Sequence, residues 1–236
     1  MRPFFKFGDN LLSLKAPWAL SELSWHLHTA LLFTWTDYKT IFIPITAFAC
    51  AAGPLHSMHN LLQTELWIWM HLLMCDVSNQ ARSKEEDAIN LLRWVVAGIC
   101  VLWSTLYYGR DQVLTSLGLL LTTFMHDEAG LSKHVIGKNF CNIFDYVAFE
   151  IGATKIIAAS RHLDSVSVHA VIISGILIST TIQAQDFPDV EGDAALGRVT
   201  FPIYAPEFSR IATLAVMVAW SIFLGLYWSL GAICSL

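Results

Sequence analysis

The sequence predicts an all-α protein that is built as a multi-span transmembrane helical bundle. Hydrophobic residues make up 55% of its 236 residues and charged residues only 14%, which is too apolar for a soluble domain of this length. The apolar residues also fall into stretches of about the 20 residues that a helix needs to cross the hydrocarbon core of a bilayer. Because no linker rich in glycine, serine or proline divides the chain, we expect one integral-membrane domain at 1–236.

Seven stretches qualify as spans, and they follow an N-terminal segment at 1–35 that is expected to lie at the membrane interface. That segment carries Trp18, Trp25 and Trp35 among leucines, a composition typical of interfacial helices. Pro44 lies inside the first span, where we expect a kink. The spans are expected at about 38–54, 60–77, 91–108, 112–126, 143–160, 165–184 and 209–230.

The distribution of lysine and arginine predicts that the N-terminus is cytoplasmic. In that orientation ten basic residues collect on the cytoplasmic side and three on the other, as the positive-inside rule requires. The formal net charge is −5, and the basic residues are scattered singly, with no run that could follow a phosphate backbone. The expected partner is therefore the lipid bilayer and not nucleic acid, and the sequence leaves the oligomeric state open.

Two acidic clusters follow predicted spans on the cytoplasmic side, and the second begins at Asp186. Asp186, Asp189 and Asp193 are spaced i, i+3 and i+7, so on a helical end they fall on one face. Such a face can hold oxygen-liganded Mg²⁺ ions that in turn bind a diphosphate. Arg198 follows in the sequence Gly-Arg-Val-Thr and offers a planar donor group for phosphate oxygens. The alternative is a solvated acidic loop.

The first acidic cluster contains Asp76, Glu85, Glu86 and Asp87, and of these Asp76 and Asp87 are in phase with the spacing of the second motif. Asn79 and Ser83 stand where a matching motif would have acids. Asn79, Ser83 and Asp87 are spaced i, i+4 and i+8, which gives one helical stripe of amide, hydroxyl and carboxylate oxygens suited to one Mg²⁺. This is a set of metal ligands, not a nucleophile with its base. The alternative is helix capping by Asn79 and Ser83 at the membrane surface.

These motifs resemble those of the UbiA superfamily of intramembrane prenyltransferases, which carry two aspartate-rich motifs on the cytoplasmic ends of helices two and six. The segment Asn-Gln-Ala-Arg-Ser from Asn79 is most similar to the fungal UbiA-type terpene cyclases. The resemblance covers about residues 30–230. It implies a helical bundle, a diphosphate held by Mg²⁺ between the motifs, an isoprenoid tail in an apolar cavity, and a location in the endoplasmic reticulum.

Two features depart from the pattern of that superfamily. Its members usually have a proline-containing capping segment before helix three, whereas here Asn90 runs directly into the next apolar stretch. Superfamily members commonly have nine spans, and we expect this chain to lack the last two. An inactive, shortened member of the family is therefore one alternative.

The resemblance implies that an allylic isoprenoid diphosphate, with farnesyl diphosphate as the expected substrate, is ionised and the carbocation cyclised to a terpene. Arg198, and more weakly Arg82, would bind the diphosphate, while Lys39 would either approach it or extend to the interface. The alternatives are an aromatic or quinone prenyltransferase, which passes the cation to an acceptor, and a transporter with Glu65 and Glu150 as its membrane-level acids. The expected metal ligands and catalytic residues are Asp76, Asn79, Ser83, Asp87, Asp186, Asp189 and Asp193.

Aromatic side chains in the spans are candidate walls for a cavity that must stabilise a carbocation. Bundle packing or interface anchoring is the more common role for each of them. His71 precedes Asp76 in the same span, and we expect it to be a buried, hydrogen-bonded histidine without a catalytic role. The candidate walls are Trp67, Trp69, Phe144 and Phe149.

Overall fold

The computed structural model of the chain describes residues 16–84, 87–195, 197 and 199–229. Within these residues every regular element is helical, so the predicted all-α fold is confirmed. The elements are α1 (Ala16–Thr34), η1 (Trp35–Tyr38), α2 (Phe42–Ala52), α3 (Met58–Lys84), α4 (Asp87–Tyr107), α5 (Arg110–Asp127), η2 (Leu131–Lys133), α6 (Val135–Ile157), α7 (Ser165–Thr181), η3 (Ile182–Asp186), α8 (Val190–Ala195), α9 (Phe201–Tyr204) and α10 (Pro206–Tyr227).

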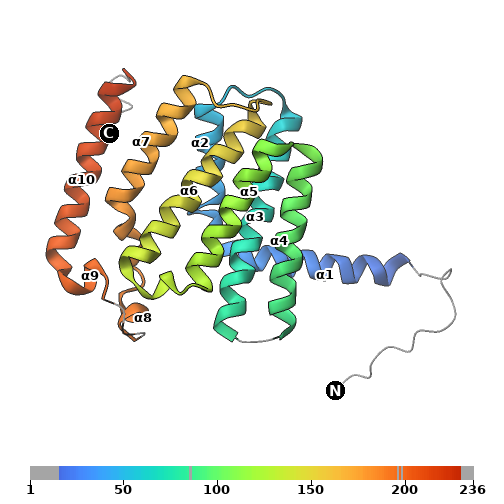
Figure 1. Ribbon diagram of the computed structural model, residues 1–236. Coiled ribbons are helices and arrows are strands. Elements are labelled where there is room, and N and C mark those ends of the chain that lie inside the picture. The colour runs from blue at the N-terminus through green and yellow to red at the C-terminus, as the bar shows by residue number, and fades with distance from the viewer. Residues whose placement is uncertain (1–15, 85–86, 196, 198, 230–236) are drawn as a thin grey trace.

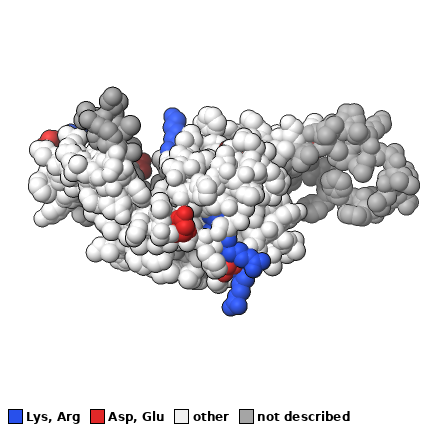
Figure 2. Space-filling view, turned by 90° about the horizontal axis from the view of Figure 1, so that it is seen from above, with Lys and Arg blue, Asp and Glu red and all other residues white. Residues whose placement is uncertain are grey.

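The long helices α2 to α7 and α10 run up and down side by side, while α1 lies across the lower half of the bundle (Figure 1). A helix that crosses a bundle in this way suits the membrane interface, which is the place predicted for this segment. The helices α3 and α4 meet at the same end of the bundle as α8, and the connections at 53–57, 108–109 and 158–164 lie at the opposite end. That opposite end, seen from above in Figure 2, is largely uncharged.

In the part of the chain that the structure describes, three helices are long and apolar enough to cross a membrane: Ile89–Tyr107, Ser165–Asp186 and Pro206–Tyr227. They correspond to the predicted spans at 91–108, 165–184 and 209–230. Their outward faces carry many exposed large apolar side chains, as lipid contact requires. The full set of seven spans and the cytoplasmic N-terminus stay predictions.

Two local expectations can be compared with the helix boundaries. The helix α2 begins only at Phe42, so Pro44 lies in its first turn, a position that tolerates proline, and not at an interior kink. The helix α4 begins at Asp87 and already contains Asn90, so no capping segment separates Asn90 from the next apolar stretch, as expected.

The helices α3, α4 and α5 are joined by four buried side chains that we call the polar ring: Trp67, His71, Ser104 and Ser116. Trp67 Nε1 donates to Ser104 Oγ at 3.1 Å, and Ser104 Oγ lies 2.7 Å from Ser116 Oγ. His71 Nε2 lies 2.8 Å from Ser116 Oγ, and His71 Nδ1 lies 2.8 Å from the carbonyl oxygen of Trp67. Because a carbonyl only accepts, Nδ1 carries the proton and Nε2 accepts from Ser116. The expectation of a buried, hydrogen-bonded His71 is confirmed.

The contact between α3 and α6 depends on a glycine. Trp67 and Phe149 are fully buried and pack edge to face, with ring centroids 6.0 Å apart. Gly152 of α6 lies beneath the indole, so close that an added Cβ would stand 2.3 Å from Trp67 Cη2. Trp67 and Phe149 therefore belong to the bundle core and are not walls of the cavity described below.

Candidate functional site at the end of an apolar cavity

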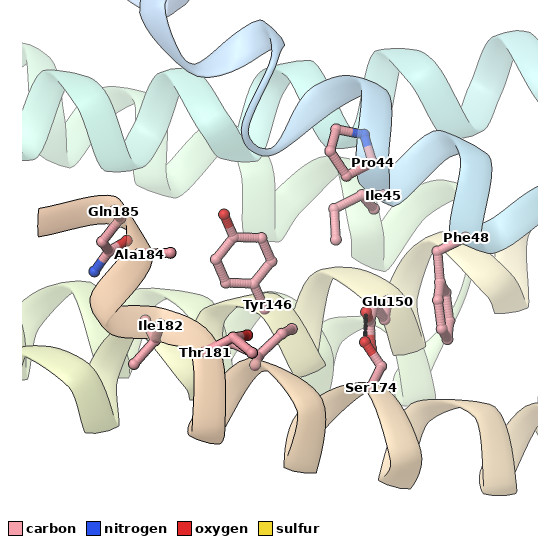
Figure 3. Close-up of a pocket in the computed structure, with 11 residues that line it drawn as sticks. Pro44, Ile45, Phe48, Tyr146, Glu150, Ser174, Thr181, Ile182, Ala184 and Gln185 are labelled. Atoms are coloured by element: carbon pink, nitrogen blue, oxygen red, sulfur yellow. Dashed lines mark hydrogen bonds between the residues drawn. The ribbon is translucent and has the colours of Figure 1, made fainter. Parts of the chain in front are cut away.

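A cavity of about 390 Å³ lies between α2, α6 and α7 and extends to η3. This volume falls within the usual range of small-molecule sites. Its walls are mainly apolar, with Ile45 and Phe48 from α2 and Ile182 from η3. Figure 3 shows Gln185 at one end of the cavity and Phe48 at the other.

The second acidic motif continues directly from the Gln185 end of the cavity. Asp186 closes η3, and α8 begins four residues later, so the helix is interrupted around Pro188 as its sequence suggests. The backbone still coils, because Asp189 N donates to Asp186 O at 3.2 Å and Asp193 N donates to Asp189 O at 2.8 Å. Asp186 and Asp193 are buried, whereas Asp189 is exposed.

A lysine on α6 forms an ion pair with the second motif. Lys138 Nζ lies 3.0 Å from Asp186 Oδ1, and both side chains are largely buried. The sequence analysis did not select Lys138. The sequence feature that could have indicated Lys138 is its position: it is a basic residue just before the predicted span at 143–160, on the same predicted membrane side as the acidic motifs. The Asp186 carboxylate thus already binds a cationic group in the folded chain.

The first acidic motif faces a carboxylate that the sequence analysis also missed. The side chain of Asp76, near the end of α3, forms a hydrogen bond with Asp37 of η1. Two carboxyl groups that face each other in this way offer oxygen ligands that a divalent cation can share. No short motif in the sequence joins these two residues, because they meet only through the tertiary fold.

Tyr146 connects the Asp37–Asp76 pair with the cavity. Its hydroxyl donates to the Thr40 carbonyl oxygen at 2.9 Å, and its ring lines the cavity. It also lies close enough to Asp37 to interact with that charge. In Figure 3 Tyr146 stands between Gln185 and Pro44, at the end of the cavity where the second motif begins. The cavity wall therefore contains Gln185, which directly precedes the second motif, and Tyr146, which interacts with the partner of Asp76.

The remaining predicted residues are placed only in part. Asn79 is exposed on α3, one turn beyond Asp76, and Lys39 is exposed in the turn that follows η1. The side chains of Arg82, Ser83 and Asp87, and the whole of Arg198, lie outside the described residues. Among the side chains that the structure describes, no three histidine, cysteine or acidic groups come together as a ready metal cluster. The seven-ligand metal site stays a prediction.

Two further acids near this end of the bundle have local partners. Asp127 accepts a hydrogen bond from Ser78 Oγ at 2.7 Å, and His126 Nδ1 lies 2.8 Å from its other oxygen. Asp145 accepts a hydrogen bond from the Thr122 hydroxyl. These contacts fasten α3 to α5 and α5 to α6, so we assign Asp127 and Asp145 to the structure of the bundle.

Comparison with known proteins supplies the context for this geometry. The chain is 26% identical over 228 residues to the fumagillin beta-trans-bergamotene synthase of Aspergillus fumigatus, which covers 89% of this chain and 78% of that protein. In Hericium erinaceus, the diterpene cyclase eriG is 27% identical over 192 residues and the polyprenyl transferase eriF 26% identical over 197 residues. The chain is a relative of terpene synthases and prenyltransferases. The resemblance drawn from the two motifs is confirmed.

The extent of these matches differs among the relatives. The matches to the two Hericium proteins cover 72% of this chain, and they span 61% of the cyclase and 66% of the transferase. No family model and no solved structure matches the chain.

The acidic residues described above have the right ligand atoms for the Mg²⁺ that the resemblance implies. Asp37 and Asp76 present facing carboxyl groups, and Asp186 presents a carboxylate that attracts a cation strongly enough to hold Lys138. Carboxylate oxygens are the ligands that Mg²⁺ prefers in proteins, usually together with water and substrate phosphates. Gln185, beside Asp186, and Tyr146, which interacts with Asp37, connect these acids with the cavity.

Proposed function

We propose that the chain is a Mg²⁺-dependent, membrane-bound class I terpene cyclase that ionises farnesyl diphosphate and cyclises the resulting carbocation. One observation carries the proposal: Gln185, the residue before the second motif, and Tyr146, which interacts with the Asp37–Asp76 pair, line the same mainly apolar cavity. The names of its relatives, a bergamotene synthase and a diterpene cyclase, agree with terpene formation. The proposed location is the membrane of the endoplasmic reticulum, as the fungal resemblance implies.

The head of the substrate would be held by the two motifs. Mg²⁺ supplies charge neutralisation for the leaving diphosphate. Lys138, once released from Asp186, would donate to the diphosphate oxygens, and we propose the same role for Arg198, Arg82 and Lys39. The proposed metal ligands are Asp76, Asn79, Ser83, Asp87, Asp186, Asp189 and Asp193, to which the geometry adds Asp37.

The apolar tail would lie in the cavity, where it is kept from water. Ser174, the deepest residue of α7 on the cavity wall, precedes Asp186 by twelve residues, a distance of about 18 Å along a helix. This is the length scale of an extended farnesyl chain. The rings of Phe48 and Tyr146 line the space and can stabilise a cation through their faces without offering a basic lone pair there.

Product analysis tests the proposal directly. The purified chain in lipid nanodiscs would be incubated with farnesyl diphosphate and Mg²⁺ alone, and the extract analysed by gas chromatography and mass spectrometry. We expect a cyclic hydrocarbon that is lost when Mg²⁺ is chelated and in Asp189→Ala. Unchanged product formation in Asp189→Ala would remove the second motif from the mechanism.

A prenyltransferase is the second candidate, because one relative is named as a polyprenyl transferase. Such an enzyme would use the same ionisation but require an acceptor for the prenyl cation. The same incubation separates the two activities when it is repeated with an added phenol. Turnover that begins only after the phenol is added would assign the chain to the transferases.

A further inference from the structure

A single carboxylic acid faces the deep part of the cavity. Glu150 of α6 lines the space one helical turn below Tyr146, and its side chain is almost completely buried. Ser174 of α7 donates a hydrogen bond to Glu150 Oε1 (Figure 3). The second oxygen, Oε2, is buried and has no hydrogen-bond partner among the described residues.

This arrangement is costly for a group that serves only to pack helices. A carboxyl group at membrane depth is expensive to bury, and such groups mark functional sites unless a partner explains them. Among the residues that the structure describes, no lysine, arginine or histidine lines this cavity, and the Tyr146 hydroxyl is already bonded to Thr40. Ser174 satisfies one oxygen only. Glu150 is therefore a carboxyl group with one oxygen bonded to Ser174 and a second, enclosed oxygen without a hydrogen-bond partner among the described residues, in the wall of a mainly apolar chamber.

We propose that Glu150 is the base that ends the cyclisation, an inference that rests on the proposed terpene cyclase function. In this step the C–H bond beside the cationic carbon breaks, and its electron pair forms the carbon–carbon double bond of the product. The proton passes to the Glu150 carboxylate. Glu150 then returns it to water when the product leaves, so the net products are a cyclic olefin, diphosphate and one proton.

The position of Glu150 suits this task better than that of any acid at the cavity mouth. Gln185, which precedes the second motif, lies at one end of the cavity, whereas Glu150 lies between Tyr146 and Phe48 (Figure 3). Among the described residues that line the cavity, Glu150 is therefore the acid that a cation formed along the tail would meet. Ser174 is a positioning residue, because its hydrogen bond to Oε1 holds the Glu150 carboxyl group in the wall of the cavity.

The test compares Glu150→Gln with the wild type and with Glu65→Gln. The control removes an acid of the same kind from α3, where Glu65 does not line the cavity. Each protein is incubated in nanodiscs with farnesyl diphosphate and Mg²⁺, and both the diphosphate released and the olefin formed are measured. We expect Glu150→Gln to lower the ratio of olefin to diphosphate by about tenfold or more, with alcohols from water capture in its place. Glu65→Gln should keep the wild-type ratio.

The outcomes separate this inference from the function on which it rests. Wild-type protein that releases no diphosphate from geranyl, farnesyl or geranylgeranyl diphosphate would overturn the cyclase and the base together. If the wild type forms olefin, and Glu150→Gln gives the same products with the same ratio of olefin to diphosphate, the cyclase function stands and the role of Glu150 is overturned. If Glu150→Gln does not fold, Ser174→Ala replaces it, because loss of the Oε1 hydrogen bond should shift the product distribution, and an unchanged distribution would count against the proposal.

Discussion

The close approach of Gly152 to Trp67 makes Gly152→Ala a strong test of how α3 packs against α6. The added methyl would stand 2.3, 2.8 and 2.8 Å from three atoms of the indole ring. The ring cannot turn aside easily, because Trp67 is fully buried and its Nε1 is bonded to Ser104. Overpacking of this kind costs about 3 kcal/mol, at the upper end of its usual range. Replacing a helical glycine by alanine returns about 1 kcal/mol, so the net loss is about 2 kcal/mol.

For a chain of this length a loss of about 2 kcal/mol corresponds to a fall of about 4–8 °C in Tm. The measurement is thermal unfolding in detergent, followed by intrinsic tryptophan fluorescence. Gly98→Ala is the matched control, since a Cβ at Gly98 in α4 meets nothing within 4 Å and should be neutral or slightly stabilising. Trp67→Phe in the Gly152→Ala background should recover part of the loss. Equal Tm values for Gly152→Ala and Gly98→Ala would refute the helix contact.

Two further predictions concern charged groups. Lys138→Met leaves the buried Asp186 without its cationic partner, so we expect the free energy of unfolding to fall by about 3 kcal/mol. Added Mg²⁺ should restore part of this loss. The control Lys133→Met, at an exposed site, should change neither the free energy of unfolding nor its dependence on Mg²⁺. Asp164 accepts the Ser167 backbone N–H at the start of α7, which lowers the pKa of its carboxyl group below the ordinary 3.8. The stabilisation from this bond is therefore present above the unfolded-state pKa and is lost as the pH falls through the lower folded-state pKa. The difference in Tm between the wild type and Asp164→Asn should shrink only below pH 3.8.

The sequence predicted the parts of the fold that follow from local patterns. Apolar runs located the helices that the structure places at Ile89–Tyr107, Ser165–Asp186 and Pro206–Tyr227, because burial in lipid depends on composition over one continuous stretch. The spacing of Asp186, Asp189 and Asp193 likewise lies within a single turn-rich segment. These features need no knowledge of how the helices pack.

The partners of the site residues could not be predicted in the same way. Lys138 and Asp186 are 48 residues apart and meet only because α6 and η3 are neighbours in the bundle. The facing of Asp37 and Asp76 depends on how η1 is placed against α3. Helical periodicity gives the face on which Glu150 lies, but whether that face meets lipid, core or cavity is decided by tertiary packing. For the same reason, Trp67 and Phe149 were candidate cavity walls in the sequence but lie in the bundle core.

The polar ring of Trp67, His71, Ser104 and Ser116 also has a consequence for motion. Sliding α3, α4 or α5 past one another would break several directional bonds at once in a medium that offers no replacement donors or acceptors. These three helices therefore behave as a stiff frame. The helices α2 and α7 lie outside that frame and form opposite walls of the chamber (Figure 3), so a hydrophobic molecule that enters or leaves the chamber should do so by parting these two walls.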